Sequence, residues 1–260
     1  DFGLQDGAVA AMYGVALGVN PELRVFNLTH EIETYNIWNA SYRLVQTLQY
    51  WPEGTVFVSV VDPGVGSERK SVVAKTKDGK YIVTPNNGTL THIHLNIGIE
   101  EIREIDETKN RLPYSNDSYT FHGRDIYAFT GARLATGVIS YEEVGPKLDL
   151  EEISLLNTGE VKIENGNTIQ GTIDILDVRF GNLWTNIPKE DFENLGIKYG
   201  DTVELTINHD SRKVYSSTVK YVKSFSEVNT GATLLYVNSL HKIGVAINQG
   251  SFSKAHQVDS

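Results

Sequence analysis

Apolar and polar residues follow two different periodicities along the chain, and the change falls near residue 145. Before it, segments with apolar residues every three or four positions alternate with short β-branched runs. The helical spacing predicts helices over residues 8–18 and 124–136, and Asn36 is expected to cap a third. The apolar face of this third helix comprises Ile37, Ala40, Leu44 and Leu48.

The short apolar runs between these segments predict β-strands. They are bounded by Gly, Pro and Asn, and they are rich in Val, Ile, Thr and Tyr. The runs are residues 23–28, 55–61, 71–75 and 81–84. Strands that alternate with helices are typical of βαβ units, so the first part of the chain is expected to be an α/β domain.

After Gly145 the pattern indicates a domain made of strands alone. Val203, Leu205 and Ile207 show the two-residue period of a half-buried strand. The strand-like runs are residues 168–177, 202–207, 214–222, 232–237 and 243–247. We therefore predict an α/β domain over 1–145, a linker over the acidic segment 146–158, and a small β-sandwich or β-barrel over 159–260.

Charge and composition narrow the classes of partner. The chain has 23 Lys and Arg against 33 Asp and Glu, a net charge of −10, with no basic run longer than two residues. This balance argues against nucleic acid or an anionic membrane as a partner. No apolar stretch approaches the roughly 20 residues that span a bilayer. The absence of cysteine excludes disulfides and thiolate chemistry and fits a cytoplasmic location.

The most informative motif is the segment Asp62-Pro-Gly-Val-Gly-Ser-Glu-Arg69. It places a carboxylate at the end of an apolar run, a glycine-rich turn next, and a guanidinium seven residues further on. Ligands of open α/β sheets lie beyond the carboxyl ends of the strands, so Asp62 is a candidate for chemistry. The alternative is an ordinary turn, because Asp-Pro-Gly is common turn chemistry.

Two further clusters lie next to predicted helix starts. Asp1 and Asp6 precede the first helix, where Asp6 is an alternative helix cap and Asp1 lies too far upstream for that role. His122 lies directly before Gly123 and the helix expected from residue 124. Histidine is readily tuned for proton transfer near neutral pH, although a lone histidine is more often structural.

A third cluster lies in the β-rich region. The segment 177–186, Asp-Val-Arg-Phe-Gly-Asn-Leu-Trp-Thr-Asn, mixes amides with aromatic rings. The amide of Asn182 offers a donor and an acceptor that match an adenine edge, and Phe180 and Trp184 offer stacking surface. A β-turn flanked by core aromatics is the alternative. The segment Pro85-Asn-Asn-Gly88 is most simply a structural turn.

Two other signals are weak. The segment Gly64-Val-Gly-Ser lacks the spacing of a phosphate-binding loop, so it does not indicate ATP binding. His92 and His94 could chelate a metal from a strand, but no third ligand is evident and no metal site is expected.

Taken in order along the chain, these motifs resemble one known superfamily. They are Asp1-Phe-Gly, Asp62-Pro-Gly-Val-Gly, Pro85-Asn-Asn-Gly, Phe121-His-Gly-Arg, Phe180-Gly-Asn-Leu-Trp-Thr-Asn and Val237-Asn-Ser. The chain is similar to the S-adenosylmethionine hydroxide adenosyltransferases, which are relatives of the fluorinases and chlorinases. The resemblance implies a Rossmann-like N-terminal domain, a C-terminal β-barrel, and a homotrimer with active sites between subunits. It also places a strand directly before Asp1.

The resemblance implies displacement at C5′ of S-adenosylmethionine by water, with methionine leaving and with no metal or cofactor. Asp62, Arg69 and His122 occupy the positions of the trio that organises the attacking water. The remaining positions imply contacts with the substrate. They comprise Asp1 at the ribose hydroxyls, Tyr35 against the sugar, Asn182 at adenine, Phe180 and Phe225 in the apolar walls, and Asp177 and Ser239 at the methionine. Asp6 and Gly123 are also expected near the substrate.

Three departures separate the chain from the halide-using members of the superfamily. Those members carry tyrosine where this chain has Asp62, and fluorinases carry serine in place of Gly123 and arginine in place of Leu240. A carboxylate at position 62 would repel a halide, so the sequence favours hydrolysis of S-adenosylmethionine to adenosine and methionine. The alternatives are a halide-dependent adenosyl transferase and a protein that binds S-adenosylmethionine or adenosine without turnover.

Overall fold

The computed structural model describes residues 1–210 and 212–258, which form two compact units. The first comprises residues 1–156 and the second begins at Asn157. This boundary lies inside the segment 146–158 that the sequence predicts as a linker. Much of that segment nevertheless belongs to the first unit, because Lys147 and Leu148 pair with a strand of its sheet.

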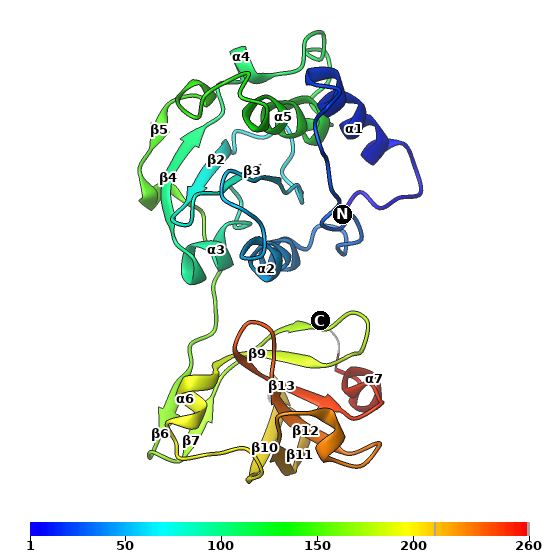
Figure 1. The fold of residues 1–260 in the computed structure, drawn as a ribbon, viewed down its shortest axis with the longest axis vertical. Helices are drawn as coiled ribbons and strands as arrows, with labels where there is room; N and C mark the ends of the chain where they lie inside the picture. Colours follow the sequence, from blue (N-terminus) through cyan, green and yellow to red (C-terminus); the bar gives the residue numbers. More distant parts are fainter. Residues whose placement is uncertain (211, 259–260) are drawn as a thin grey trace. The chain divides into compact units, whose positions relative to one another are not determined.

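The first unit is a five-stranded sheet with helices on both faces (Figure 1). Its strands, in the spatial order β1-β3-β2-β4-β5, are β1 (Val56–Val58), β3 (Tyr81–Pro85), β2 (Ser71–Thr76), β4 (Ile99–Glu104) and β5 (Lys147–Leu148). The helices are α1 (Ala8–Val19), α2 (Ile37–Leu48), α3 (Thr91–Asn96), α4 (Glu107–Asn110), the π-helix η1 (Gly123–Ala128) and α5 (Phe129–Ala135), with 3₁₀ turns η2 (Glu142–Val144) and η3 (Leu150–Glu152).

Helices cover the sheet of the first unit on both sides. In Figure 1, α1 and α5 lie on one side of the sheet, and α2 and α3 lie on the other. The central strand β2 is accordingly buried along nearly its whole length, as expected for a strand with both faces covered. On the α5 side, Val73 and Val83 pack in one core cluster with Ile126 and Tyr127.

The predicted helices are confirmed, and α2 shows why the spacing of its apolar residues predicts a helix. Asn36 caps it, because the Asn36 side chain accepts a hydrogen bond from the Asn39 N–H. The apolar residues Ala40, Leu44 and Leu48 are all buried. The predicted helix over 124–136 is also present, although its first turn is the π-helix η1.

Two expectations for the first unit are wrong. Residues 23–28 form no strand, and Phe26 is 62% exposed in this segment. A strand needs a hydrogen-bonded neighbour, and the segment has none among the described residues. The sheet is also not built from successive parallel βαβ units. β1 and β3 are parallel, whereas β2 pairs antiparallel with both β3 and β4.

The second unit contains a curled half-barrel sheet. Its strands, in the spatial order β10-β11-β12-β13-β9-β8, are β10 (Thr202–His209), β11 (Arg212–Tyr221), β12 (Thr233–Val237), β13 (Lys242–Ile247), β9 (Leu183–Pro188) and β8 (Ile173–Leu176). The strands β6 (Lys162–Glu164) and β7 (Thr168–Gln170) form a separate hairpin. The helices are α6 (Lys189–Glu193), α7 (Phe252–His256) and the 3₁₀ turn η4 (Phe225–Glu227).

The two-residue period that the sequence shows in β10 is confirmed by its packing. Ile207 belongs to the core cluster of the second unit, and Val203 and Leu205 pack against that cluster. The run predicted as one strand over 168–177 is divided into β7 and β8 around Gly171. A side chain at Gly171 would lie within 2.3 Å of the Asn186 side chain, so the close approach of β9 requires glycine there.

Candidate functional site

The glycine-rich turn after β1 brings Asp62 and Arg69 into a buried ion pair. One terminal nitrogen of Arg69 donates to both Asp62 carboxylate oxygens, at 2.7 and 2.5 Å. The side chains are only 5% exposed for Asp62 and 16% for Arg69. A buried charge is costly unless it is paired, and here each ion compensates the other. The turn is therefore the frame of an ion pair as well as a chain reversal.

Tyr127 of the π-helix η1 helps to hold this pair, and no sequence motif indicates this role. The other terminal nitrogen of Arg69 donates to the Lys70 carbonyl at 3.2 Å and to the Tyr127 hydroxyl at 3.4 Å. The Tyr127 and Ser71 hydroxyls lie 3.0 Å apart, and burial raises the pKa of Tyr127. Tyr127 is therefore a neutral phenol that orients the guanidinium.

His122 lies directly before η1 with its ring buried. The residue is 6% exposed, and its Nε2 is a buried atom without a hydrogen-bond partner among the described residues. Burial lowers the pKa of His122, and the charges of Asp62 and Arg69 both act on it. The imidazole is therefore neutral near pH 7, and its buried nitrogen is free to accept a proton from a bound water.

Gly123 lets the N-terminal segment approach the residue after His122. A side chain at position 123 would lie 2.7 Å from the ring of Phe2, and the rings of Phe2 and Phe121 lie 5.5 Å apart. Even the small serine side chain would collide with Phe2 unless that ring moved. Gly123 thus shapes this part of the site through its lack of a side chain.

Asp1 and Tyr35 lie together although 34 positions separate them. An Asp1 carboxylate oxygen accepts a hydrogen bond from the Tyr35 N–H at 2.9 Å. Tyr35 has the left-handed φ of 69°, and it is 68% exposed. The Asp6 carboxylate instead accepts from the N–H of Ala8, the first residue of α1, at 2.9 Å, although the N-cap position is Gly7 rather than Asp6.

The Asn-Asn-Gly segment after β3 is a structural turn that supports Asp62. The Asn87 side chain donates to the Val61 carbonyl at 2.8 Å, directly before Asp62. The Asn86 side chain donates to the Glu152 carbonyl and accepts from the Ser154 N–H. Both amides are thus used in fixing the backbone beside the ion pair.

In the second unit, the loop between β8 and β9 is organised around Asp177. One of its carboxylate oxygens accepts from the backbone N–H groups of Arg179 and Phe180, at 3.0 and 3.3 Å. The Asn182 side chain donates to the other oxygen at 3.4 Å. The loop leaves Asn182 buried and the Phe180 ring 65% exposed. It thus presents an aromatic face next to a fixed amide.

Tyr236 connects this loop to Phe225, and the sequence analysis missed it. The Trp184 indole donates to the Tyr236 hydroxyl at 2.8 Å, and the Tyr236 and Phe225 rings lie 5.1 Å apart. Burial raises the pKa of Tyr236 to about 12, while a hydrogen bond with Asn182 acts to lower it. A tyrosine inside a predicted strand carries no sequence signal that separates a site residue from core.

The contacts link most of the predicted residues within each unit. In the first unit, Asp62 pairs with Arg69, Asp1 accepts from the Tyr35 N–H, and Phe2 lies against Gly123, the residue after His122. The group in the second unit comprises Asp177, Phe180, Asn182 and, through Tyr236, Phe225. Ser239 is exposed in the turn between β12 and β13.

The histidine pair on α3 has a structural explanation. His92 and His94 lie on helix α3 rather than on a strand, and His92 Nδ1 is 2.9 Å from the Ser41 hydroxyl. Within residues 1–210 and 212–258, no group of His, Asp or Glu side chains is arranged to hold a metal. No helix in the same residues is long and apolar enough to cross a membrane.

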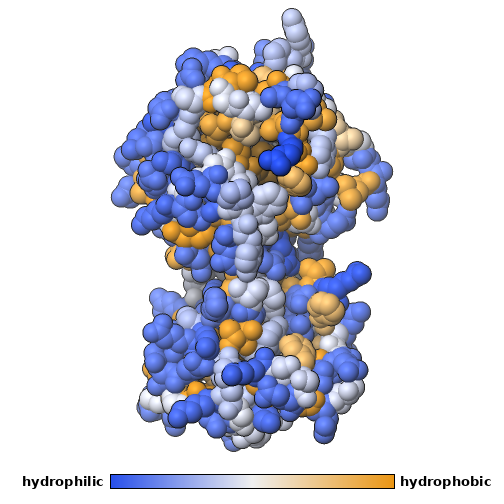
Figure 2. Space-filling model, viewed as in Figure 1, coloured by the Kyte–Doolittle hydropathy of each residue, from blue (hydrophilic) through white to orange (hydrophobic). Residues whose placement is uncertain are grey.

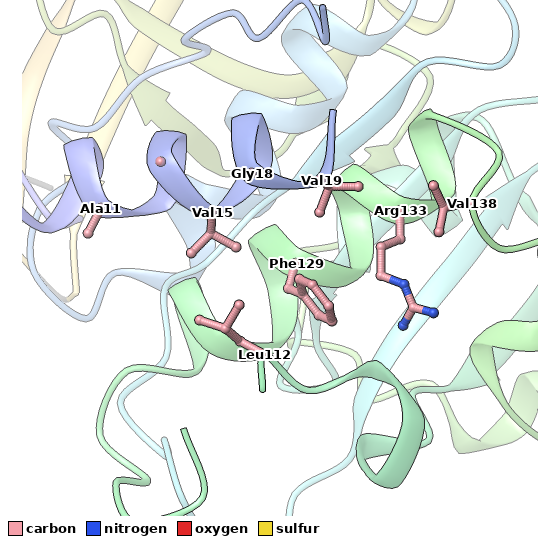
Figure 3. A pocket seen from close by; sticks show the side chains of 9 residues that line it. Ala11, Val15, Gly18, Val19, Leu112, Phe129, Arg133 and Val138 are labelled. Atoms are coloured by element: carbon pink, nitrogen blue, oxygen red, sulfur yellow. The ribbon is translucent and has the colours of Figure 1, made fainter. Parts of the chain in front are cut away.

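An apolar groove of about 600 Å³ lies between α1 and α5 (Figure 3). Gly14, Gly18 and Val15 line it from α1, and Phe129 and Arg133 line it from α5. The Arg133 guanidinium donates to the Lys109 carbonyl and the Asn110 side chain. This groove offers apolar surface without a carboxylate or an imidazole, so it is not where the predicted chemistry takes place.

Comparison with known proteins bears on both units. The family model described as the SAM hydroxide adenosyltransferase N-terminal domain matches residues 1–145, and the model of the C-terminal domain matches residues 171–260. An (R)-S-adenosyl-L-methionine hydrolase of Methanocaldococcus jannaschii is 35% identical over all of this chain and 90% of its own. A fluorinase of Actinopolyspora mzabensis is 26% identical over 97% of this chain and 90% of its own.

A solved structure gives the same answer for the fold. The crystal structure of an uncharacterized conserved protein from Thermotoga maritima covers all of this chain and 95% of its own, with a TM-score of 0.91 and 35% identity. Because the N-terminal and C-terminal domain models of the family match in order over most of the chain, the chain belongs to the SAM hydroxide adenosyltransferase family.

Proposed function

We propose that the chain hydrolyses S-adenosyl-L-methionine at C5′ of the ribose, giving adenosine and L-methionine. The observation that carries this proposal is the buried Asp62–Arg69 pair together with the unpaired Nε2 of His122, whose pKa the charges of both ions influence. A carboxylate, a guanidinium and a neutral imidazole together suit a bound water better than a halide. The 35% identity to a protein named (R)-S-adenosyl-L-methionine hydrolase supports the same reaction.

The proposed step balances without a metal or cofactor. The water oxygen forms a bond to C5′, the bond between C5′ and sulfur breaks, and its electron pair returns to sulfur as the methionine thioether. His122 Nε2 accepts the proton that the water loses. The sulfonium is already an activated leaving group, so the site needs mainly to position the water in line and to limit its hydration.

The other site residues would bind the substrate. Asn182 would read the adenine edge, with Phe180 and Phe225 as apolar walls, and Asp177 and Ser239 would hold the amino and carboxylate groups of the methionine. In the first unit, Asp1 would bind the ribose hydroxyls, with Tyr35 against the sugar. The Asp1 contact with the Tyr35 N–H supports this pairing, because it fixes the carboxylate while its second oxygen can accept from a ribose hydroxyl.

We further propose that the chain acts as a cytoplasmic homotrimer. In this assembly, a Rossmann-like first unit of one subunit completes a site with the β-barrel unit of its neighbour. Two features support an assembly. The site residues are divided between the two units, and helix α1 lacks charged residues yet buries only Val9 and Ala16. A helix that is apolar all round is normally covered. Figure 2 shows apolar surface on the first unit.

Product analysis tests the reaction. Purified protein is incubated with S-adenosylmethionine in chloride buffer, and the products are identified by mass spectrometry. The proposal predicts adenosine and methionine in equal amounts. Formation of 5′-chloro-5′-deoxyadenosine would favour the halide-dependent transferase, and tight binding without any product would favour a binding protein.

Mixing two impaired variants tests the shared site. Asp62→Asn lowers turnover and Asn182→Ala weakens substrate binding, so at S-adenosylmethionine concentrations well below the KM of Asn182→Ala each variant alone has reduced activity. After the subunits have been exchanged by mild denaturation and refolding, mixed trimers would contain some sites with neither substitution. Activity should then exceed the mean of the two separate variants. Activity that stays at that mean would show that each site belongs to one subunit.

A further inference from the structure

The segment that leads into His122 is fastened by one buried arginine that belongs to none of the predicted motifs. Arg111 directly follows α4, and its side chain is only 7% exposed. One terminal nitrogen contacts the Glu107 carboxylate at 3.1 Å. The remaining donors reach the Ser115 hydroxyl at 3.2 Å and the carbonyls of Ser115 and Ser118 at 3.3 and 2.7 Å. A single guanidinium thus links the two ends of the segment from Arg111 to Ser118.

The same arginine also contacts Tyr119, the residue that directly follows this segment. Its guanidinium carbon lies 4.6 Å from the centre of the Tyr119 ring, which is a cation–π contact. The Tyr119 and His122 rings are 6.3 Å apart in an edge-on arrangement. At the near end, the Leu112 N–H donates to the Asp125 carbonyl of η1. The loop is therefore fixed on both sides of the residues that precede His122.

Tyr119 in turn lies against the glycine-rich turn of the Asp62–Arg69 pair. A side chain at Gly66 would come within 2.9 Å of the Tyr119 carbonyl oxygen, and Gly66 has a left-handed φ of 76°. Both facts require glycine at this position. The contact joins the two segments that supply the proposed catalytic groups, with Tyr119 between them.

We infer that Arg111 is a positioning residue, which with Glu107 and Tyr119 fixes the loop 112–121 on the glycine-rich turn and so holds His122 beside the Asp62–Arg69 pair. The inference rests on the proposed hydrolysis, because it concerns the placement of the group that receives the proton.

The charges of Glu107 and Arg111 also influence the pKa of His122. Four ionic groups act on His122. Burial is the largest cause of its lowered pKa, after which Glu107 raises the pKa, Arg111 lowers it, Asp62 raises it and Arg69 lowers it. The charges of two carboxylate–guanidinium pairs thus act on the imidazole. Loss of either member of the Glu107–Arg111 pair leaves the other member uncompensated and displaces the pKa of His122 in a direction set by its sign.

Three variants of the full chain test the inference. They are Arg111→Met, which keeps an apolar stem without charge, Arg111→Lys, which keeps the charge without the fork, and Glu107→Gln. Lys109→Met is the matched control, because Lys109 is a neighbouring cation that is 72% exposed and pairs with Asp106. Turnover and KM for S-adenosylmethionine are measured across pH, and the titration of His122 is followed by NMR.

Arg111→Met is expected to lower kcat about tenfold or more with a smaller change in KM, because misplacement by about 1 Å can cost as much as 100-fold in rate. The His122 titration should move to higher pH in Arg111→Met and to lower pH in Glu107→Gln. Arg111→Lys should return the titration toward the wild-type position while kcat recovers only in part. Lys109→Met should behave as wild type.

Two results would overturn the inference. One is wild-type kcat in Arg111→Met, and the other is a loss of stability or kcat with no displacement of the His122 titration. The NMR titration reports on the variants even where turnover is too slow to measure. If the wild-type chain and Lys109→Met form no adenosine at all, the proposed function fails instead, and the two failures are thus distinguishable.

Discussion

The two units place their candidate site residues in contrasting environments. In the first unit, Asp62, Arg69 and His122 are buried, and the two ions are paired with each other before any ligand arrives. In the second unit, Phe180 is largely exposed, and one carboxylate oxygen of Asp177 accepts hydrogen bonds from two backbone N–H groups of its own loop. The trio Asp62, Arg69 and His122 is charged and enclosed, whereas the loop around Asp177 exposes the Phe180 ring next to the buried amide of Asn182.

This difference follows from what each group is proposed to do. A group that activates water benefits from burial, because fixed charges act more strongly where solvent is excluded. A group that recognises a purine needs an accessible aromatic face and one fixed amide, and the bound ligand then covers that face. Substitutions of Asp62, Arg69 or His122 should therefore affect rate, and those of Phe180 or Asn182 should affect affinity.

The largest effect is expected from Asp62→Asn. The amide keeps the shape of the carboxylate but cannot hold and polarise water in the same way, and Arg69 loses its counter-ion. We expect kcat to fall about 10²–10⁴-fold, the usual range for general-base assistance, because His122 can deprotonate the water efficiently only where Asp62 holds it, and we expect little change in the affinity for S-adenosylmethionine. Steady-state kinetics and calorimetry measure the two quantities. Turnover near the wild-type rate in a folded variant would mean that the glycine-rich turn is only a turn.

A smaller effect of the opposite kind is expected from Asn182→Ala. An adenine edge left without its partner should cost about 1–3 kcal/mol of binding, for adenosine as well as for S-adenosylmethionine. Calorimetry with adenosine isolates this effect from turnover. Asn167→Ala is the control, because Asn167 is an exposed asparagine in the β6–β7 turn of the same unit. Equal adenosine affinity in both variants would assign Asn182 to loop structure alone.

The smallest expected difference between the two units is in their dependence on pH. His122 must be neutral to accept a proton, and burial lowers its pKa. Activity, measured as kcat/KM, should thus fall only as the pH drops through a midpoint below the ordinary histidine value of 6.5. Adenosine binding should stay constant over the same range, because Tyr236 in the second group titrates only near 12. A midpoint above 6.5, or a parallel loss of adenosine binding, would contradict this division.

The sequence predicted the elements whose pattern is local. The helix from Ile37 to Leu48 has a cap and a regular apolar face, and β10 has its two-residue period, so both were predictable. Strand pairing depends on distant partners, which is why residues 23–28 were wrongly expected to be a strand and the antiparallel pairing of β2 was not foreseen. Apolar residues report burial, but they do not report which neighbour supplies it.

The candidate site divides in the same way. Residues in compact polar motifs, such as Asp62 with Arg69 or Asp177 with Asn182, were identified, and the structure confirms that each pair is in contact. Tyr127 and Arg111 were missed because neither belongs to a recognisable motif, although each contacts residues near the site. Only the fold shows that a tyrosine in a helix or an arginine in a loop reaches a distant group.

The most direct test of the account uses water enriched in oxygen-18. S-adenosylmethionine has sulfur rather than oxygen on C5′, so the 5′-hydroxyl of any adenosine formed by the proposed attack must come from the solvent. Incubation in labelled water followed by mass spectrometry should give adenosine that carries one heavy oxygen at the 5′ position, and unlabelled methionine. Adenosine without the label at that position, or a nucleoside product that carries chloride instead, would contradict the central claim that this chain directs water to C5′.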